Sequence, residues 1–135
     1  MLQRQRFMFT DLQSGMSDVG AVLVLEDEML VAVLIEDCLH DLGATEVTLC
    51  MTVGEAARLI EEKHYDCAVL DVRVGGTDSF AIADRLADKG IPFVFASASM
   101  PEEFPQRHRD RLQLSKPFSN QQLVEALLAA LAATT

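Results

Sequence analysis

The segment DCAVLD, residues 66–71, decides the fold of this chain. Four consecutive apolar residues lie between two aspartates, and Gly75-Gly76 interrupts the chain a few residues later. A short continuous apolar run bounded by turn residues is typical of a strand that is buried on both faces. We therefore expect residues 66–71 to form a buried strand that ends at Asp71.

Similar apolar runs occur on both sides of this segment and alternate with apolar residues at helical spacing. Pro101 and Pro105 bracket Glu-Glu-Phe, so any helix between residues 100 and 110 should be short or irregular. Ser119 and Gln122 form a capping-box pair at the start of the last helix. We expect strands at residues 21–25, 46–50, 66–71, 92–96 and 111–114, and helices at residues 30–42, 55–63 and 79–88 and from residue 119 onward. This alternation predicts an α/β fold with a doubly wound, five-stranded parallel sheet and helices on both faces.

The length of 135 residues fits one folded domain, which we place at residues 19–135. Residues 1–18 carry no clean periodicity, and we expect a flexible leader there. Met16 could also be the natural start, because Met16-Ser17-Asp18 runs directly into the first strand.

The overall composition excludes several classes of partner. The net charge of −10 repels phosphate backbones, so direct nucleic-acid binding is not expected. No apolar run is long enough to span a bilayer. The three cysteines lie far apart in apolar runs, without the short spacings of a metal site. We interpret them as buried hydrophobic residues of a cytoplasmic protein.

Polar side chains follow successive strands of the predicted sheet, at the edge where α/β proteins bind ligands. They are Glu26, Asp27 and Glu28, then Asp71, then Ser97, and finally Lys116. Each has an ordinary explanation, as a helix N-terminus, a turn residue or a loop residue. Together, the carboxylates would repel one another unless they bind a divalent cation, and oxygen ligands select Mg²⁺ or a related ion. A cation, a lysine and a hydroxyl form a pocket suited to a phosphoryl group.

Four segments at these strand ends resemble the receiver domains of two-component response regulators. They are VLEDE (residues 24–28), VLD (69–71), FASA (95–98) and SKPF (115–118). The match is collinear over roughly residues 20–133, and Asp27 and Asp71 are separated by 71 − 27 = 44 residues, similar to the usual spacing in the family. The resemblance implies a flavodoxin-like fold with strand order 2-1-3-4-5. We expect the stand-alone, single-domain type, since no output domain follows residue 133.

The resemblance also implies roles for individual residues. Asp71 would accept a phosphoryl group from a histidine kinase or a histidine phosphotransfer protein. The implied Mg²⁺ ligands are Glu26, Asp27, Asp71 and the backbone carbonyl of Arg73. Lys116 would pair with the phosphoryl oxygens, its bond to Pro117 would be cis, and Ser97 would move toward the phosphoryl group as the switching step.

The expected function is therefore phosphorelay signal transduction rather than turnover of an external substrate. The domain would catalyse only its own phosphorylation and a slow hydrolysis. Output would pass through contact with a downstream protein target, without membrane binding. The Leu- and Ala-rich last helix could support a homodimer, but burial against the sheet explains its apolar residues equally well.

Two residues depart from the family pattern. Arg73 is larger than the residue usual two positions after the acceptor, and we hypothesise that its guanidinium reaches the phosphoryl group; the alternative is a solvated surface arginine. Gln113 occupies a position that commonly holds an aromatic residue, which indicates an altered output face.

Three other functions compete with this interpretation. A haloacid-dehalogenase-type phosphatase needs a second carboxylate two residues after the first, where this chain has Arg73. A flavodoxin-like cofactor binder would place the acidic residues 26–28 against a phosphate, which they would repel. A non-phosphorylated pseudo-receiver would not need the complete acidic set together with Ser97 and Lys116.

Overall fold

A parallel sheet of five strands forms the middle layer of the protein. The computed structural model describes residues 19–98 and 104–133, so the expected leader at residues 1–18 and the position of Pro101 lie outside the described residues. The strands are β1 (Ala21–Leu25), β2 (Glu46–Cys50), β3 (Cys67–Leu70), β6 (Phe93–Ser97) and β7 (Gln113–Ser115), in the spatial order β2-β1-β3-β6-β7. Since β6 and β7 are the fourth and fifth strands of this sheet along the chain, the predicted order 2-1-3-4-5 is confirmed.

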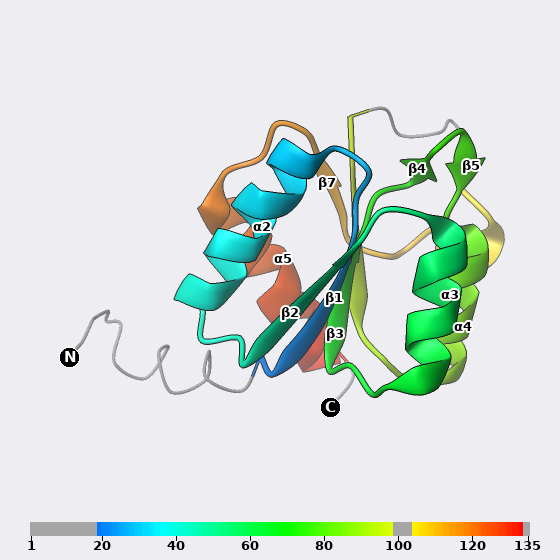
Figure 1. The fold of residues 1–135 in the computed structure, drawn as a ribbon, viewed down its shortest axis with the longest axis horizontal. Coiled ribbons are helices and arrows are strands. Elements are labelled where there is room, and N and C mark those ends of the chain that lie inside the picture. Colours follow the sequence, from blue (N-terminus) through cyan, green and yellow to red (C-terminus); the bar gives the residue numbers. More distant parts are fainter. Residues whose placement is uncertain (1–18, 99–103, 134–135) are drawn as a thin grey trace.

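Helices cover both faces of the sheet, as predicted (Figure 1). Helices α2 (Met29–Asp41) and α5 (Asn120–Ala133) pack on one face, and α3 (Val53–Glu62) and α4 (Phe80–Asp88) pack on the other. Successive residues of β1 alternate between the two cores: Leu23 packs with α3 and α4, whereas Val24 packs with α2 and α5. In the described residues, no helix combines the length and the apolar character needed to cross a membrane.

The predicted helix boundaries agree with the structure to within two residues. At the start of α5, the Ser119 N–H donates to Gln122 Oε1 at 2.8 Å, and the Gln122 N–H donates to Ser119 Oγ at 3.1 Å. This is the predicted capping box. Gly43 follows α2 with a positive φ of 90°, which only a residue without a side chain adopts without strain.

Between residues 104 and 112, the described part of the segment before β7, the only helix is a short 3₁₀ helix, η1 (Gln106–His108), in agreement with the expectation that any helix there is short or irregular. The His108 ring is fully buried among phenylalanines, and its Nε2 lies 2.7 Å from Asp84 Oδ1. The predicted start of the last strand at residue 111 is wrong by two residues. The Arg111 N–H bonds to the His108 carbonyl, so Arg111 still belongs to the turn, and pairing with β6 begins at Gln113.

A small antiparallel hairpin lies at the carboxyl end of the sheet (Figure 1). It consists of β4 (Arg73–Val74) and β5 (Thr77–Asp78), joined by Gly75 and Gly76. These glycines have φ values of 60° and 80°. Positive φ at both central residues is what the favoured two-residue hairpin turn requires. The sequence predicted a break at the two glycines but not the pairing on either side.

Candidate functional site

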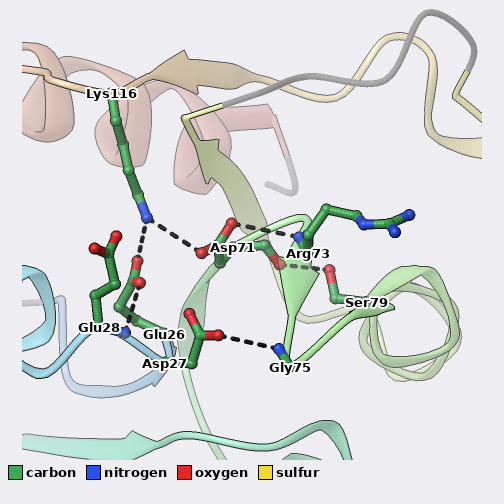
Figure 2. Close-up of polar contacts among 8 residues, drawn as sticks. All are labelled: Glu26, Asp27, Glu28, Asp71, Arg73, Gly75, Ser79 and Lys116. Carbon is green, nitrogen blue, oxygen red and sulfur yellow. Dashed lines mark hydrogen bonds and ion pairs between the residues drawn. The ribbon is translucent and has the colours of Figure 1, made fainter.

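Three carboxylates meet at the carboxyl edge of the sheet. Glu26 and Asp27 directly follow β1, and Asp71 directly follows β3. These strands are neighbours, with Leu25 beside Leu70, so the residues after them lie next to each other. One oxygen atom from each carboxylate lies within 4.8 Å of the other two. Figure 2 shows the three side chains directed toward a common point.

Lys116 closes this cluster from the loop between β7 and α5. Its Nζ donates to Glu26 Oε1 at 2.6 Å and to Asp71 Oδ2 at 3.2 Å (Figure 2). The Lys116 backbone N–H donates to the Ser97 carbonyl at 2.9 Å, which places the lysine at the end of β6. The Lys116–Pro117 peptide bond is cis, as the family resemblance implied.

The cluster is deep enough for its charges to interact strongly. Glu26 is 1% exposed and Asp71 is 7% exposed, whereas Asp27 is open to solvent. Burial raises the pKa of Glu26, and the hydrogen bonds from Lys116 and from the Glu28 N–H only partly offset it. Burial alone would lower the pKa of Lys116, but the hydrogen bond to Glu26 and the attraction of both carboxylates leave that pKa raised. The ammonium therefore stays charged between the two carboxylates.

Glu28 supports the cluster without joining it. Its backbone N–H donates to Glu26 Oε2 at 3.0 Å, while its own side chain is exposed. Asp27 is held from another direction, because its Oδ2 accepts a hydrogen bond from the Gly75 N–H at 3.0 Å. Of the three acidic residues after β1, the first two thus face the site.

Arg73 lies beside Asp71, but its side chain leaves the site. The Arg73 N–H points to Asp71 Oδ1 over 3.4 Å, and the exposed guanidinium is directed away from the carboxylates (Figure 2). The structure thus agrees with the surface alternative and not with a guanidinium that reaches the site. The reason is strand alternation in β4: Val74 is buried, so its neighbour Arg73 faces outward.

Ser97 is the last residue of β6 and is 4% exposed. Its carbonyl accepts the Lys116 N–H, so the serine is adjacent in the sheet to the lysine loop. Its role as a switch stays a prediction.

Sequence reasoning missed Ser79. Its hydroxyl is completely buried and donates to the backbone carbonyl of Asp71 at 2.6 Å (Figure 2). In the sequence, a serine before an apolar helix signals only an N-cap. No local pattern could have revealed a partner eight residues earlier in the chain.

The arrangement suits chemistry on a phosphoryl group. Clustered carboxylate oxygens are the ligands that Mg²⁺ prefers, and their excess negative charge is neutralised by such an ion. A charged lysine next to a carboxylate can bind further oxygen atoms. Phosphoryl transfer depends mainly on such positioning and charge neutralisation.

Comparisons with known proteins agree with this description. The family model described as "Response regulator receiver domain" matches residues 22–128. The solution structure of SdrG from Sphingomonas melonis Fr1 is 40% identical, with a TM-score of 0.74, and the match covers 84% of this chain and 97% of that one. The receiver domain of the sensor histidine kinase PA1611 from Pseudomonas aeruginosa PAO1 shares the fold, at 24% identity and a TM-score of 0.68 over 83% of this chain and 97% of that one. That structure has a magnesium ion coordinated in its active site cleft.

The chain is also similar to a curated protein. The transcriptional regulatory protein PdtaR of Mycobacterium tuberculosis is 31% identical over 110 residues, which cover 78% of this chain and 54% of PdtaR. The chain thus spans about half the length of the curated relatives it matches. With the family model matching most of the chain and the fold matching receiver structures, this chain belongs to the response regulator receiver domain family.

Proposed function

We propose that this receiver domain accepts a phosphoryl group on Asp71, from a phosphohistidine of a histidine kinase or histidine phosphotransfer protein, in a Mg²⁺-dependent reaction. One observation carries the proposal. The Asp71 carboxylate lies within one cluster with two further carboxylates and the Lys116 ammonium. Such a cluster offers both a cation site and a cationic partner for phosphoryl oxygens.

Mg²⁺ fits the donor set, because all the proposed ligands are oxygen atoms. The residues that would hold it are Glu26, Asp27, Asp71 and the backbone carbonyl of Arg73. The bound ion would supply positive charge that lets the negative phosphoryl group approach the carboxylates.

The chain's own groups would carry out the transfer. A carboxylate oxygen of Asp71 forms the new O–P bond while the P–N bond of the phosphohistidine breaks, and the histidine leaves with the bonding electrons. Lys116, whose ammonium already donates a hydrogen bond to Asp71, holds a phosphoryl oxygen by a charge-assisted hydrogen bond. The Ser97 hydroxyl then donates a hydrogen bond to another phosphoryl oxygen, which is the proposed switching step.

The product is an acyl phosphate on the protein itself, so the output is a change of state and not a released product. We propose that slow hydrolysis resets the domain and that it acts in the cytoplasm, through a downstream protein target. A homodimer through α5 stays a prediction.

An apolar surface next to the site supports contact with a protein donor. Met29, Leu30 and Leu34 of α2 are exposed. Of these, Leu34 lines a cavity of about 400 Å³ together with Phe118 and Lys116. Exposed apolar patches of this kind mark protein-binding surfaces.

The proposal is tested by incubating the protein with Mg²⁺ and acetyl phosphate and measuring its intact mass. We expect a gain of one phosphoryl group that is absent in Asp71→Asn and in the presence of a chelator. Asp37→Asn, which changes an exposed aspartate of α2, is the matched control and should be labelled like the wild type. A wild-type protein that gains no mass would contradict the proposal, and so would labelling that persists in Asp71→Asn.

A further inference from the structure

Ser79 occupies the N-cap position of α4 but does not use its hydroxyl to cap that helix. An N-cap serine normally accepts a hydrogen bond from a backbone N–H two or three residues later. Within α4 as the structure describes it, no such bond is made. The Phe80 N–H instead donates to Asp78 Oδ1 at 3.2 Å. The polar contact that the structure gives this hydroxyl is the hydrogen bond that it donates to the backbone carbonyl of Asp71.

Two hydrogen bonds close the chain between Asp71 and Ser79 into a loop. The first joins Ser79 Oγ to the Asp71 carbonyl at 2.6 Å, and the second joins the Ser79 N–H to the Val72 carbonyl at 2.9 Å. The Ser79 side chain is 0% exposed, so water cannot replace the first bond without a rearrangement. Loss of a buried hydroxyl would leave the carbonyl unsatisfied, which costs more than the bond itself.

The hairpin inside this loop contacts two of the three clustered carboxylates (Figure 2). At its base, the Arg73 N–H faces Asp71 Oδ1 at 3.4 Å. At its tip, the Gly75 N–H donates to Asp27 Oδ2 at 3.0 Å. The hairpin therefore extends from one carboxylate to the other, and its position depends on the base that Ser79 closes.

We infer that Ser79 is a positioning residue of the phosphoryl-transfer site: its hydroxyl fixes the Asp71 backbone and the β4–β5 hairpin, and through them the orientation of Asp71 and Asp27. The inference deepens the proposed function and rests on it for the chemistry. Ser79 itself touches neither the phosphoryl group nor the ion; it acts through the backbone of Asp71.

The test compares Ser79→Ala with the wild type in a Mg²⁺ titration that follows the Gly75 amide signal by NMR. Residues that orient metal ligands typically change metal affinity by about 10-fold or more when they are removed, so we expect Mg²⁺ to bind Ser79→Ala about 10-fold more weakly. Because less of the variant then carries Mg²⁺, its rate of labelling by acetyl phosphate at subsaturating Mg²⁺ should also fall. Ser79→Thr keeps the hydroxyl, so it should have most of the wild-type Mg²⁺ affinity and most of the wild-type labelling rate.

Thr52→Ala is the matched control. Thr52 is the N-cap of α3, and its hydroxyl accepts the Glu55 N–H at 3.0 Å, which is ordinary capping. Both alanine variants should lower the melting temperature, but only Ser79→Ala should lose Mg²⁺ affinity. If Ser79→Ala does not fold, Ser79→Cys takes its place, because the thiol fills the buried position of the hydroxyl but is only a weak hydrogen-bond donor.

Undiminished Mg²⁺ affinity in the variant without the hydroxyl would overturn the inference, and so would an equal loss in Thr52→Ala. Failure of the proposed function looks different. Suppose that the wild type binds Mg²⁺, that Ser79→Ala binds it more weakly, and that neither protein is ever labelled. That result would support the positioning role of Ser79 and contradict phosphoryl acceptance on Asp71.

Discussion

Lys116 balances the charges of the site at the scale of single residues. Its Nζ lies between Glu26 Oε1 and Asp71 Oδ2, at 2.6 Å and 3.2 Å. The lysine side chain is only 10% exposed, so solvent screens this attraction less than it would at the surface. The ammonium therefore lies close to the carboxylates that would also bind a metal ion, and the two positive charges would repel each other.

Replacing Lys116 by methionine should affect metal binding and phosphorylation in opposite directions. Without the ammonium, Mg²⁺ no longer meets a like charge, and we expect it to bind about 10-fold more tightly, which corresponds to about 1.4 kcal/mol. Labelling by acetyl phosphate should slow, because the phosphoryl oxygens lose their cationic partner.

Calorimetric titration and intact-mass kinetics measure the two effects. Lys89→Met, which changes a lysine that faces Glu61 at 4.0 Å outside the acidic cluster, is the control and should change neither. Weaker Mg²⁺ binding in Lys116→Met would contradict this account of the charge balance.

The free cysteines are chemically protected by the fold. Burial raises the pKa of the Cys67 thiol to about 12, with a smaller effect from the charge of Asp66. Burial likewise raises the pKa of Cys50 to about 12, with a smaller effect from Glu55. Because the thiolate is the reactive form, we expect the native protein to resist alkylation at pH 8 and the unfolded protein to react rapidly.

The same shift makes stability depend on pH. Burial of Cys67 favours the protonated thiol, whose pKa in the folded state lies above its ordinary value of 9.0. The folded state therefore keeps its full stability below pH 9 and loses stability as the pH rises toward 12, because the thiol ionises more readily in the unfolded chain. Urea unfolding at pH 8 and pH 10.5 should show a larger loss for the wild type than for Cys67→Ala. Rapid alkylation of native protein at pH 8 would show that these thiols are not buried as described.

The β4–β5 hairpin gives a test at the scale of elements. A side chain added at Gly76 would meet no atom within 4 Å, but its φ of +80° strains any other residue. We expect Gly76→Ala to destabilise the protein by about 1 kcal/mol. Gly54, in α3, also has open space around it and no positive φ, so Gly54→Ala should stabilise the protein, by about 0.5 kcal/mol.

Urea denaturation of the two variants measures this contrast. Since both substitutions add the same methyl group, the opposite signs isolate backbone conformation from packing. Equal effects of the two substitutions would mean that the turn does not hold its positive φ in solution.

Elements with a strong internal pattern were predictable from the sequence. The strand at residues 21–25 was predicted with its observed bounds, because a buried strand needs an unbroken apolar run. The start of β7 was predicted wrongly, since Arg111 is held in a turn by a hydrogen bond to the carbonyl of the buried His108. Burial of His108 depends on phenylalanines from distant segments, which no local window contains.

The same distinction applies to the candidate site. Glu26, Asp27, Asp71 and Lys116 were predictable because each directly follows a strand, and strand ends meet at one edge of a parallel sheet. Ser79 and the direction of Arg73 were not, because both depend on a hairpin of two-residue strands. Such short strands carry too few residues to show alternation.

Metal binding should stabilise the whole molecule, because a site assembled from the residues that follow β1 and β3 exists only in the folded state. At a Mg²⁺ concentration of 100 times the dissociation constant, the free energy of unfolding should rise by about 2.7 kcal/mol. Asp27→Asn should lose most of this gain, although the amide that replaces the carboxylate keeps an oxygen to accept the Gly75 N–H. The control Asp37→Asn should keep the full Mg²⁺-dependent gain in the free energy of unfolding. If Asp27→Asn gained as much as the wild type, the ion would have to bind elsewhere.

The most direct test locates the phosphoryl group on the folded protein. Wild-type protein is labelled with acetyl phosphate and Mg²⁺ and then treated with borohydride, which reduces an aspartyl phosphate to homoserine, and the peptides are sequenced by mass spectrometry. The account predicts homoserine at position 71, with every other aspartate and glutamate intact. Homoserine at another position, or phosphate recovered on a histidine or serine, would contradict it.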